Sequence, residues 1–346
     1  MSSAAPTPAG LGVPVIDLSA FIDPTDPPDD VVEAVGDAAA RFGFFQVVHH
    51  GIPDELIDRV WDRTAAFFAL PIDEKRRLLR TKENSRGYYD RELTKNARDR
   101  KEVLDLAHQL RPDLPDDDPA NRHDVDGANQ WPDLDGFRQT ILDWLDACED
   151  LSLRLLAAFT VGLGEPAKLL APHFGPGHSS FVRLNHYPLD DPLTGEEAAE
   201  VTALGDMALH HHSDAGALTV LLQDEVGGLQ VEHAGTWIDV EPIPGAIVVN
   251  TGDMMQVWSN DRYRAALHRV RPITDRPRTS LPYFFNPTYD ADYAPLPGSV
   301  AGGDHPHYSS INWGHFRQAR ADGDYADVGH EIQIADFVVS PGDRPR

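Results

Sequence analysis

Apolar residues in the first half of the chain follow both helical and extended patterns. They recur every three or four positions over residues 31–42, 54–70 and 134–163, which predicts three helices. Two short apolar runs, 13–18 and 44–48, predict strands. A segment rich in Pro and Asp, 112–132, is predicted to be a surface insertion, with a mobile lid as the alternative.

From about residue 181 the pattern changes to short β-rich runs separated by turns that contain glycine. The predicted strands are 181–187, 217–223, 229–233, 236–240, 246–250, 255–258, 267–271 and 280–285. Many short strands at close spacing predict a closed or double-sheet β structure. Residues 307–320 return to a helical pattern.

These patterns together predict an α+β fold made of one domain. A flexible arm, residues 1–12, is expected to precede a single domain over residues 13–340. Within it, we expect three parts in chain order: a helix-rich N-terminal half (13–165), a β core (178–290) and a helical tail (305–340).

Composition narrows the class of protein. Among 346 residues there is one cysteine, Cys148, which excludes an internal disulfide and a multi-cysteine zinc site and favours a reducing cytoplasm. No apolar run approaches a membrane span, and the first twelve residues lack the features of a secretory signal. A net charge of −26 disfavours nucleic acid and anionic membrane as partners. A monomer is the default expectation.

One segment has the opposite charge. Residues 75–101 contain 11 Lys and Arg against four acidic residues, a local balance of +7. One interpretation is a solvated surface. The other is a positive rim that attracts an anionic small molecule.

Three side chains have the types and spacing of a metal site. His212 and Asp214 are two residues apart, so in an extended segment they point to the same side. His268 lies in a later predicted strand. Two imidazoles and one carboxylate on one face, with open positions opposite, form the facial triad of non-haem Fe(II) oxygenases. A single His-x-Asp pair is weak evidence in a chain with 16 His.

Polar side chains on two other predicted strands suit a carboxylate. Arg278 and Ser280 share a strand face ten residues after His268, and the planar guanidinium can bind a carboxylate through two hydrogen bonds. Asn185 and Tyr187 also share a strand face, and a buried tyrosine hydroxyl requires a polar partner. Each residue alone also suits an ordinary surface or core position. Jointly they indicate a carboxylate site.

With these residues and a longer series of motifs, the sequence resembles a known family, the isopenicillin N synthase-like branch of the Fe(II)/2-oxoglutarate-dependent dioxygenases. The resemblance runs from about residue 14 to residue 337, and its motifs occur in the family's order. They are Pro14-Val15-Ile16-Asp17-Leu18, Gly43-Phe44-Phe45 through His50-Gly51-Ile52, Arg86-Gly87-Tyr88, Asn185-His186-Tyr187-Pro188, His212-Ser213-Asp214 through Thr219, Gly227-Gly228-Leu229, Pro244-Gly245-Ala246 through Asp253, His268-Arg269-Val270, Arg278-Thr279-Ser280 and Phe284-Phe285-Asn286-Pro287.

The resemblance implies a catalytic domain with a distorted double-stranded β-helix, or jelly roll, and flanking helices. It implies three ligands for Fe(II): His212, Asp214 and His268. It implies a second group of residues that binds the cosubstrate 2-oxoglutarate: Arg278, Ser280, Tyr187 and Asn185. The implied reaction consumes O₂ and oxidises a small molecule by hydroxylation, desaturation or cyclisation, with succinate and CO₂ as coproducts.

Two alternatives stay open. The chain could be an Fe(II) oxidase of the isopenicillin N synthase type, which does not use 2-oxoglutarate. Arg278 and Ser280 would then bind a substrate carboxylate. It could also be a non-catalytic jelly-roll binding or sensor protein. The intact triad and the intact Arg278 and Ser280 argue against this second alternative.

The substrate is expected to bear a carboxylate or an amine, because residues 75–101 have an excess of Lys and Arg and include the Arg86-Gly87-Tyr88 motif. A role in secondary metabolism or in amino-acid modification is expected. Neither the substrate nor the type of oxidation follows from the sequence. The candidate substrate-pocket residues are Arg86, Tyr88, Tyr89, Lys95, Lys101, Phe181, His210, Trp258 and Phe285.

Overall fold

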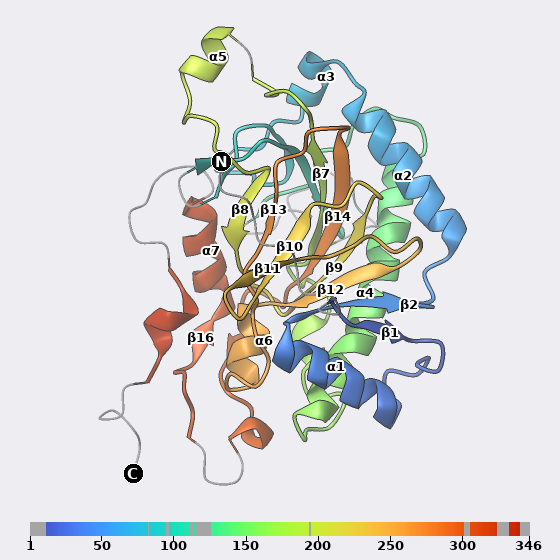
Figure 1. The fold of residues 1–346 in the computed structure, drawn as a ribbon, viewed down its shortest axis with the longest axis vertical. Coiled ribbons are helices and arrows are strands. Elements are labelled where there is room, and N and C mark those ends of the chain that lie inside the picture. Colours follow the sequence, from blue (N-terminus) through green and yellow to red (C-terminus); the bar gives the residue numbers. More distant parts are fainter. Residues whose placement is uncertain are drawn as a thin grey trace.

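Two β-sheets of unequal size lie at the centre of the computed structural model of this chain (Figure 1). Within the described residues the larger sheet has eight strands, which in spatial order are β1 (Val15–Asp17), β2 (Phe44–Val48), β12 (Ile247–Thr251), β9 (Leu218–Gln223), β14 (Arg278–Phe285), β7 (Phe181–Tyr187), β6 (Glu102–Ala107) and β3 (Gly87–Tyr89). The smaller sheet has four strands: β11 (Thr236–Asp239), β10 (Leu229–His233), β13 (His268–Val270) and β8 (Leu209–His212).

The structure describes most of the chain. The described residues are 12–81, 83–94, 97–110, 114, 126–193, 195–300, 305–323 and 332–339. The predicted arm, apart from Gly12, and most of the predicted insertion 112–132 lie outside them, as does the candidate pocket residue Lys95.

Helices cover the face of the larger sheet that is turned away from the smaller one. The long helix α4 (Phe137–Gly162) contacts β6, β9 and β14, while α1 (Asp29–Arg41) and α2 (Asp54–Phe68) pack on α4 (Figure 1). Buried residues recur along α4 at helical spacing, as at Trp144, Cys148, Leu151 and Leu155. This stripe packs against the sheet and forms much of the hydrophobic core.

Short elements complete the described chain. The helices are α3 (Ile72–Arg76), α5 (Gly195–Ala199), α6 (Asp253–Trp258) and α7 (Trp313–Gly323), with 3₁₀ turns at Ala171–Phe174, Pro297–Ser299 and Ile334–Phe337. Two small two-stranded sheets pair β4 (Leu93–Thr94) with β5 (Ala97–Arg98) and β15 (Asp292–Tyr293) with β16 (Ile311–Asn312). No helix in the described ranges is long and apolar enough to cross a membrane.

Alternation along β14 separates two environments. Leu281 and Tyr283 belong to the core under α4, whereas Ser280, Pro282 and Phe284 line a cavity between the two sheets. Successive side chains of a strand point to opposite faces, so one strand serves both. The cavity therefore lies on the face of the larger sheet that α4 does not cover.

Most predicted elements are confirmed, and two differences have clear causes. Residues 255–258 form part of helix α6 instead of a strand, because this short helix is buried on nearly every side and so its apolar run lacks helical periodicity. The N-terminal half also contributes strands β3 and β6 to one edge of the larger sheet. All six residues of β6 are buried, including Glu102 and Asp105, so polar residues there do not mark an exposed face.

Candidate active site

His212 and His268 lie directly opposite each other on the neighbouring strands β8 and β13. Their ring centroids are 4.3 Å apart. Asp214 follows β8, and its Oδ1 lies 3.7 Å from His212 Nε2 and 3.6 Å from His268 Nε2. The structure therefore brings together the three residues of the predicted triad, with ligand atoms within 4.8 Å of one another.

Backbone carbonyls orient both imidazoles. His212 Nδ1 donates to the carbonyl of His210 at 2.9 Å, and His268 Nδ1 donates to the carbonyl of Ala266 at 3.2 Å. Each bond places the ring proton on Nδ1 and leaves the lone pair of Nε2 directed at Asp214. Metal-binding histidines are usually held in this way.

The ionisation states also suit a metal. Burial, together with His268, lowers the pKa of His212 to about 3, so this imidazole is neutral at pH 7. Burial alone would raise the pKa of Asp214, but His268, His212 and hydrogen bonds from Thr219 and Asn250 lower it. Neutral imidazoles and an ionised carboxylate are the states that bind a divalent metal.

The predicted carboxylate site is made of two cross-strand pairs. Arg278 on β14 lies opposite Tyr187 on β7, and Ser280 lies opposite Asn185. Arg278 Nη1 donates to Ser280 Oγ at 3.0 Å, and its guanidinium carbon lies 5.1 Å from the centre of the Tyr187 ring. Gln223 on β9 accepts a second, longer bond from Arg278 at 3.4 Å.

Arg278 is a buried cation that faces the cavity without a carboxylate partner among the described residues. It is 1% exposed, and its Nε has no hydrogen-bond partner. Asn185 Oδ1 is likewise buried and unpartnered. A buried guanidinium requires a counter-ion or strong acceptors. A dicarboxylic keto acid such as 2-oxoglutarate, bound through its distal carboxylate, satisfies that requirement.

These groups open into one cavity of about 390 Å³ between the two sheets. Its described wall includes the triad, the four residues of the carboxylate site and apolar side chains such as Phe44, Leu221 and Phe284. Helix α7 supplies three wall residues that the sequence analysis missed: Trp313, Arg317 and Arg320. Their spacing of four and three residues in a predicted helix was the available signal.

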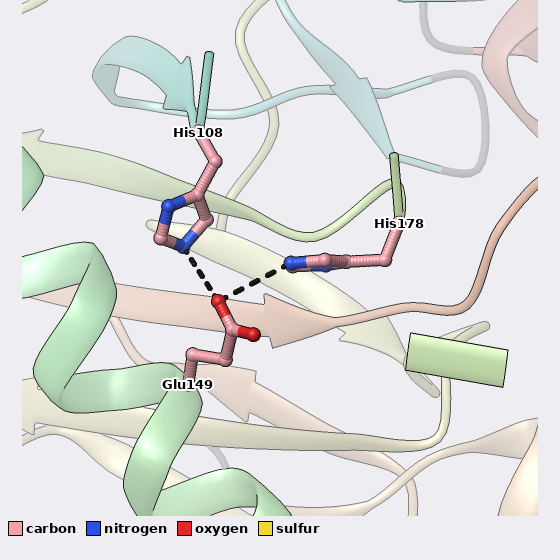
Figure 2. Close-up of side chains that lie close together, drawn as sticks. All are labelled: His108, Glu149 and His178. Carbon is pink, nitrogen blue, oxygen red and sulfur yellow. Dashed lines mark hydrogen bonds and ion pairs between the residues drawn. The ribbon is translucent and has the colours of Figure 1, made fainter. Parts of the chain in front are cut away.

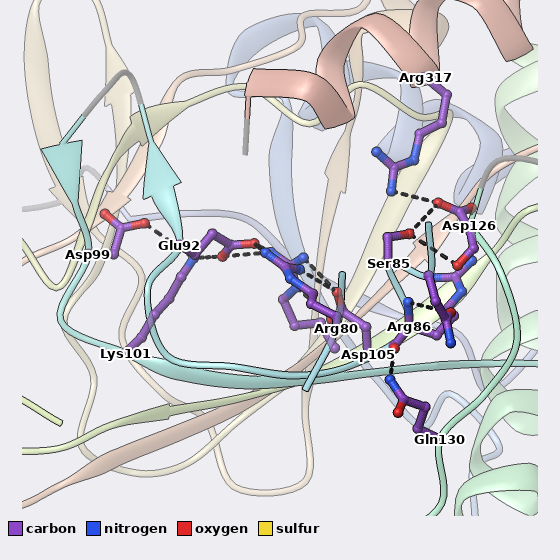
Figure 3. Close-up of polar contacts among 12 residues, drawn as sticks. Arg80, Ser85, Arg86, Glu92, Asp99, Lys101, Asp105, Asp126, Gln130 and Arg317 are labelled. Carbon is purple, nitrogen blue, oxygen red and sulfur yellow. Dashed lines mark hydrogen bonds and ion pairs between the residues drawn. The ribbon is translucent and has the colours of Figure 1, made fainter. Parts of the chain in front are cut away.

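The basic segment 75–101 is only partly a solvated surface, because five of its nine described cations are buried: Lys75, Arg80, Arg86, Arg98 and Lys101. Arg80 and Lys101 both bond Glu92, at 2.7 and 2.6 Å, and Arg86 bonds Asp126 at 3.0 Å (Figure 3). Buried cations of this segment are therefore neutralised by carboxylates, several of which lie outside it. The local charge of +7 did not reveal these partners.

Two of the candidate pocket residues, Phe181 and Lys101, line the cavity. The other described candidates are absent from its described wall and have other contacts. Arg86 pairs with Asp126, and His210 bonds Asp99 at 2.8 Å. The remaining four have aromatic or cation–π contacts elsewhere: Tyr88 with Phe67, Tyr89 with Arg80, Trp258 with Phe174 and Phe285 with Phe174.

Comparison with known families fits this geometry. The family described as the 2OG-Fe(II) oxygenase superfamily matches residues 178–287, and the N-terminal family described as non-haem dioxygenase in morphine synthesis matches residues 13–134. The chain belongs to the 2OG-Fe(II) oxygenase superfamily. Its cofactors are therefore Fe(II) and 2-oxoglutarate, with O₂ as oxidant, and this oxygenase is an oxidoreductase.

Individual relatives agree. The chain is 35% identical over 314 residues to the 2-oxoglutarate-Fe(II) type oxidoreductase hxnY of Emericella nidulans, covering 86% of each protein. It is 34% identical over 309 residues to feruloyl CoA ortho-hydroxylase 1 of Arabidopsis thaliana, covering 86% of this chain and 76% of that protein.

Solved structures confirm the predicted jelly-roll class of this oxygenase. T7H of Neurospora crassa, solved with alpha-KG and thymine, superposes with a TM-score of 0.74 and 28% identity, covering 92% of this chain and 99% of that one. JOX2, solved with 2OG, Fe and JA, has a TM-score of 0.72 and 30% identity, covering 90% and 86%. These relatives favour a catalytic enzyme that uses 2-oxoglutarate over both alternatives left open by the sequence.

Proposed function

We propose that this oxygenase binds Fe(II) through His212, Asp214 and His268. We also propose that it binds the distal carboxylate of 2-oxoglutarate through four residues: Arg278, Ser280, Tyr187 and Asn185. The observation that carries the second assignment is the buried Arg278, which faces the cavity and has no carboxylate partner among the described residues. With O₂, the bound iron and 2-oxoglutarate supply the oxidising power for hydroxylation, desaturation or cyclisation.

Each group of residues has its own task in this proposal. Asp214 and the two imidazoles hold the metal on one side and leave the cavity side open. Arg278 and Ser280 fix the far end of the keto acid and so orient its reactive end toward the triad. Apolar residues such as Phe44 and Phe284 limit water around the reacting groups.

The substrate we infer is a small molecule with a carboxylate and an apolar body. Besides Arg278 and Asp214, the described cavity wall includes four cationic side chains and one carboxylate: Lys101, Arg183, Arg317, Arg320 and Glu92. Asp99, Asp105 and Asp126 behind the wall neutralise part of this charge, but ammonium and guanidinium groups are donors only, so they favour an anionic acceptor over an amine. Phe181 and Trp313 line the same cavity and suit an apolar portion.

The relatives support a small-molecule substrate but do not identify it. The substrates in their names differ, from feruloyl CoA to the homoarginine of homoarginine-6-hydroxylase 2-ODD-233 of Oryza sativa, which is 31% identical to this chain. Secondary metabolism and amino-acid modification both fit this range. Cytoplasmic location and a monomeric state stay predictions.

Anaerobic titration of the Fe(II)-loaded protein with 2-oxoglutarate tests the proposed cosubstrate site. Chelation of iron by the keto acid should give a saturable absorption band near roughly 500 nm, as expected for a chelate that fills two open Fe(II) positions. The R278A protein should bind iron but need far more 2-oxoglutarate for the band. If iron binds and no band forms, the assignment of Arg278 and Ser280 to 2-oxoglutarate is wrong.

Succinate release then identifies the substrate class. A panel of carboxylic acids, amines and neutral analogues of matched size should show stimulation by the acids first. KM for an active acid should rise with salt concentration, because screening weakens the attraction of the cavity cations. A neutral substrate whose KM does not respond to salt would contradict the inferred substrate class.

A further inference from the structure

A second group of metal-binding side chain types lies at the end of the larger sheet where β7 begins (Figure 2). His108 follows β6, His178 precedes β7 and Glu149 comes from α4. One ligand atom from each residue lies within 4.8 Å of the others. None of the three lines the cavity that contains the triad.

The two groups lie on opposite faces of β14. Tyr283, which is close enough for the charge of Glu149 to affect its hydroxyl, points away from the cavity into the core under α4. Its neighbours Pro282 and Phe284 line the cavity instead. The larger sheet therefore lies between the two groups.

The spacing of the atoms matches a metal coordination shell. Glu149 Oε2 lies 3.2 Å from His108 Nε2 and 3.3 Å from His178 Nε2, and both rings point at this oxygen in Figure 2. Ligands at about 2.0–2.1 Å from a tetrahedral Zn²⁺ are separated by roughly 3.3–3.4 Å. The side chains thus need little movement to enclose a cation.

The Nδ1 contacts of both rings leave each Nε2 directed at Glu149, where a metal would bind. Ser180 donates its single hydroxyl proton to the carbonyl of Asn286 at 3.0 Å, so His178 Nδ1 is the donor in its 2.7 Å contact with Ser180 Oγ. The His108 ring bonds the Leu145 backbone, and its Nδ1 lies 3.5 Å from Asp146 Oδ1. His108 Nε2 is buried and has no hydrogen-bond partner.

The ring protons therefore lie on Nδ1, as in most metal-binding histidines. Without a metal, His178 Nε2 donates to Glu149 Oε2 at 3.3 Å, and a cation between them would replace this proton. The Nε2 atoms and this carboxylate repel one another unless a cation or such an extra proton lies between them.

Negative charge on the same helix also favours a cation. Asp143, Asp146, Glu149 and Asp150 lie within eight residues of α4. Like charges this close along a helix repel one another. A divalent cation beside Glu149 would relieve this repulsion.

We propose that His108, Glu149 and His178 form a second metal site, which binds a divalent first-row transition metal of the zinc class. Two imidazoles and one carboxylate suit Zn²⁺, whereas Mg²⁺ and Ca²⁺ prefer shells made of oxygen. The fourth position is left to water. Because the site joins α4 to the ends of β6 and β7 outside the cavity, its role is structural.

The test separates this site from the iron site by removing the iron site. Untagged H212A/H268A protein, stripped of metal, is titrated with Co²⁺ and followed by visible d–d absorption, then with Zn²⁺ by calorimetry. We expect one equivalent of each metal to bind. Introducing E149Q into the H212A/H268A protein should abolish this binding. Adding S180A should weaken it by about 10-fold to 100-fold, because Ser180 orients His178.

Matched controls make the result specific to these residues. Asp143→Asn, on the same helix but bonded to Arg59, should bind metal like its parent. Zn²⁺ should raise the melting temperature of the parent but not of the E149Q variant, whose folding is checked by circular dichroism without metal. In the otherwise wild-type protein, E149Q should retain succinate release.

Two results would overturn the second metal site. One is the absence of Co²⁺ and Zn²⁺ binding by folded H212A/H268A protein. The other is equal metal binding after E149Q is added to H212A/H268A, which would show that exposed histidines elsewhere bind the metal. If H212A/H268A fails to fold, metal analysis of wild-type and E149Q proteins decides. Two equivalents of metal in the wild type against one in the E149Q protein support the proposal, and equal metal contents contradict it. None of these results depends on turnover.

Discussion

Asn250 donates from Nδ2 to Oδ2 of Asp214 at 2.7 Å, and this bond determines which carboxylate oxygen faces the two histidines. Thr219 donates to the same oxygen at 2.6 Å. Oδ1 is therefore the oxygen directed at His212 and His268. Strands β12 and β9 of the larger sheet thus orient a ligand that follows a strand of the smaller sheet.

Replacing Asn250 should therefore weaken metal binding without removing a ligand. We expect Asn250→Ala to lower the affinity for Fe(II) by about 10-fold to 100-fold, as found when residues that orient metal ligands are lost. Anaerobic Fe(II) titration measures this, with Asn312→Ala, a change at an exposed residue bonded to Asp292, as the control. Unchanged affinity would mean that Asp214 needs no orientation by Asn250.

Loss of a proposed ligand should have a larger effect. His212→Ala and Asp214→Ala should each abolish Fe(II) binding and succinate release. The neighbouring His211→Ala is the matched control, because His211 is exposed and contacts the Trp237 ring. Metal analysis and succinate release are measured on the same samples. Full activity of either ligand variant would refute the triad assignment.

Arg278→Ala should affect the cosubstrate and leave iron bound. Hydrogen bonds to charged groups contribute about 1.5–3 kcal/mol, so KM for 2-oxoglutarate should rise about 10-fold to 100-fold. Arg276→Ala, which removes an exposed cation paired with Glu225, should leave this KM unchanged. If R278A changes only the KM of the primary substrate, Arg278 binds the substrate instead.

Glu92 should be important for stability. It is buried and bonds Arg80, Arg183 and Lys101, and these cations lower its pKa although burial raises it. Glu92→Gln removes one of two carboxylates from each of these cations, since Arg80 and Arg183 keep Asp105 and Lys101 keeps Asp99. The free energy of unfolding should fall by about 3 kcal/mol, the lower end of the range for a broken buried ion pair. Chemical denaturation measures this loss.

The control for this prediction is Glu197→Gln, since Glu197 pairs with Arg76 at the surface. Exposed ion pairs contribute about 0–1 kcal/mol, so this variant should unfold almost like the wild type. Equal stabilities of both variants would show that the buried network around Glu92 adds nothing.

His50 should make stability depend on pH. Burial lowers its pKa below the ordinary 6.5, with a smaller lowering from Arg154 and an opposing effect from Asp54. The Ile52 N–H donates to Nδ1 at 3.1 Å, so Nε2 donates to the Gly245 carbonyl at 2.9 Å. Protonation of Nδ1 would break the bond from Ile52.

The unfolded chain therefore binds more protons than the folded one just below pH 6.5. Stability from His50 is complete above about pH 6.5 and is lost as pH falls toward the lower folded pKa. His50→Gln keeps both hydrogen-bonding roles without titrating, so denaturation between pH 7 and pH 5 should show a smaller loss than in the wild type. An equal loss would exclude His50 as a source of this dependence.

The sequence predicted the parts of the site that depend on local spacing. Alternation within strands places Arg278 beside Ser280, and Asn185 beside Tyr187. It does not specify which strands are neighbours, so the His212–His268 pairing and the contribution of Gln223 needed the structure.

The sequence did not predict the acidic partners of the buried cations. Arg80 and Lys101 belong to a basic segment, yet both are buried against Glu92. Arg86 bonds Asp126, forty residues later in the chain. A local charge balance cannot show such partners, because folding determines which acidic residues arrive beside each cation.

The position of β2 between β1 and β12 has a consequence for how the chain is made. Gln46 bonds the carbonyl of Glu241, 195 residues later, and β2 has its antiparallel neighbour only in residues 247–251. During translation, one edge of β2 therefore has no partner strand until residues 247–251 have been synthesised. Such an edge can join a neighbouring nascent chain. Production of this enzyme should benefit from low expression levels, which keep nascent chains apart, and from chaperones that hold extended segments.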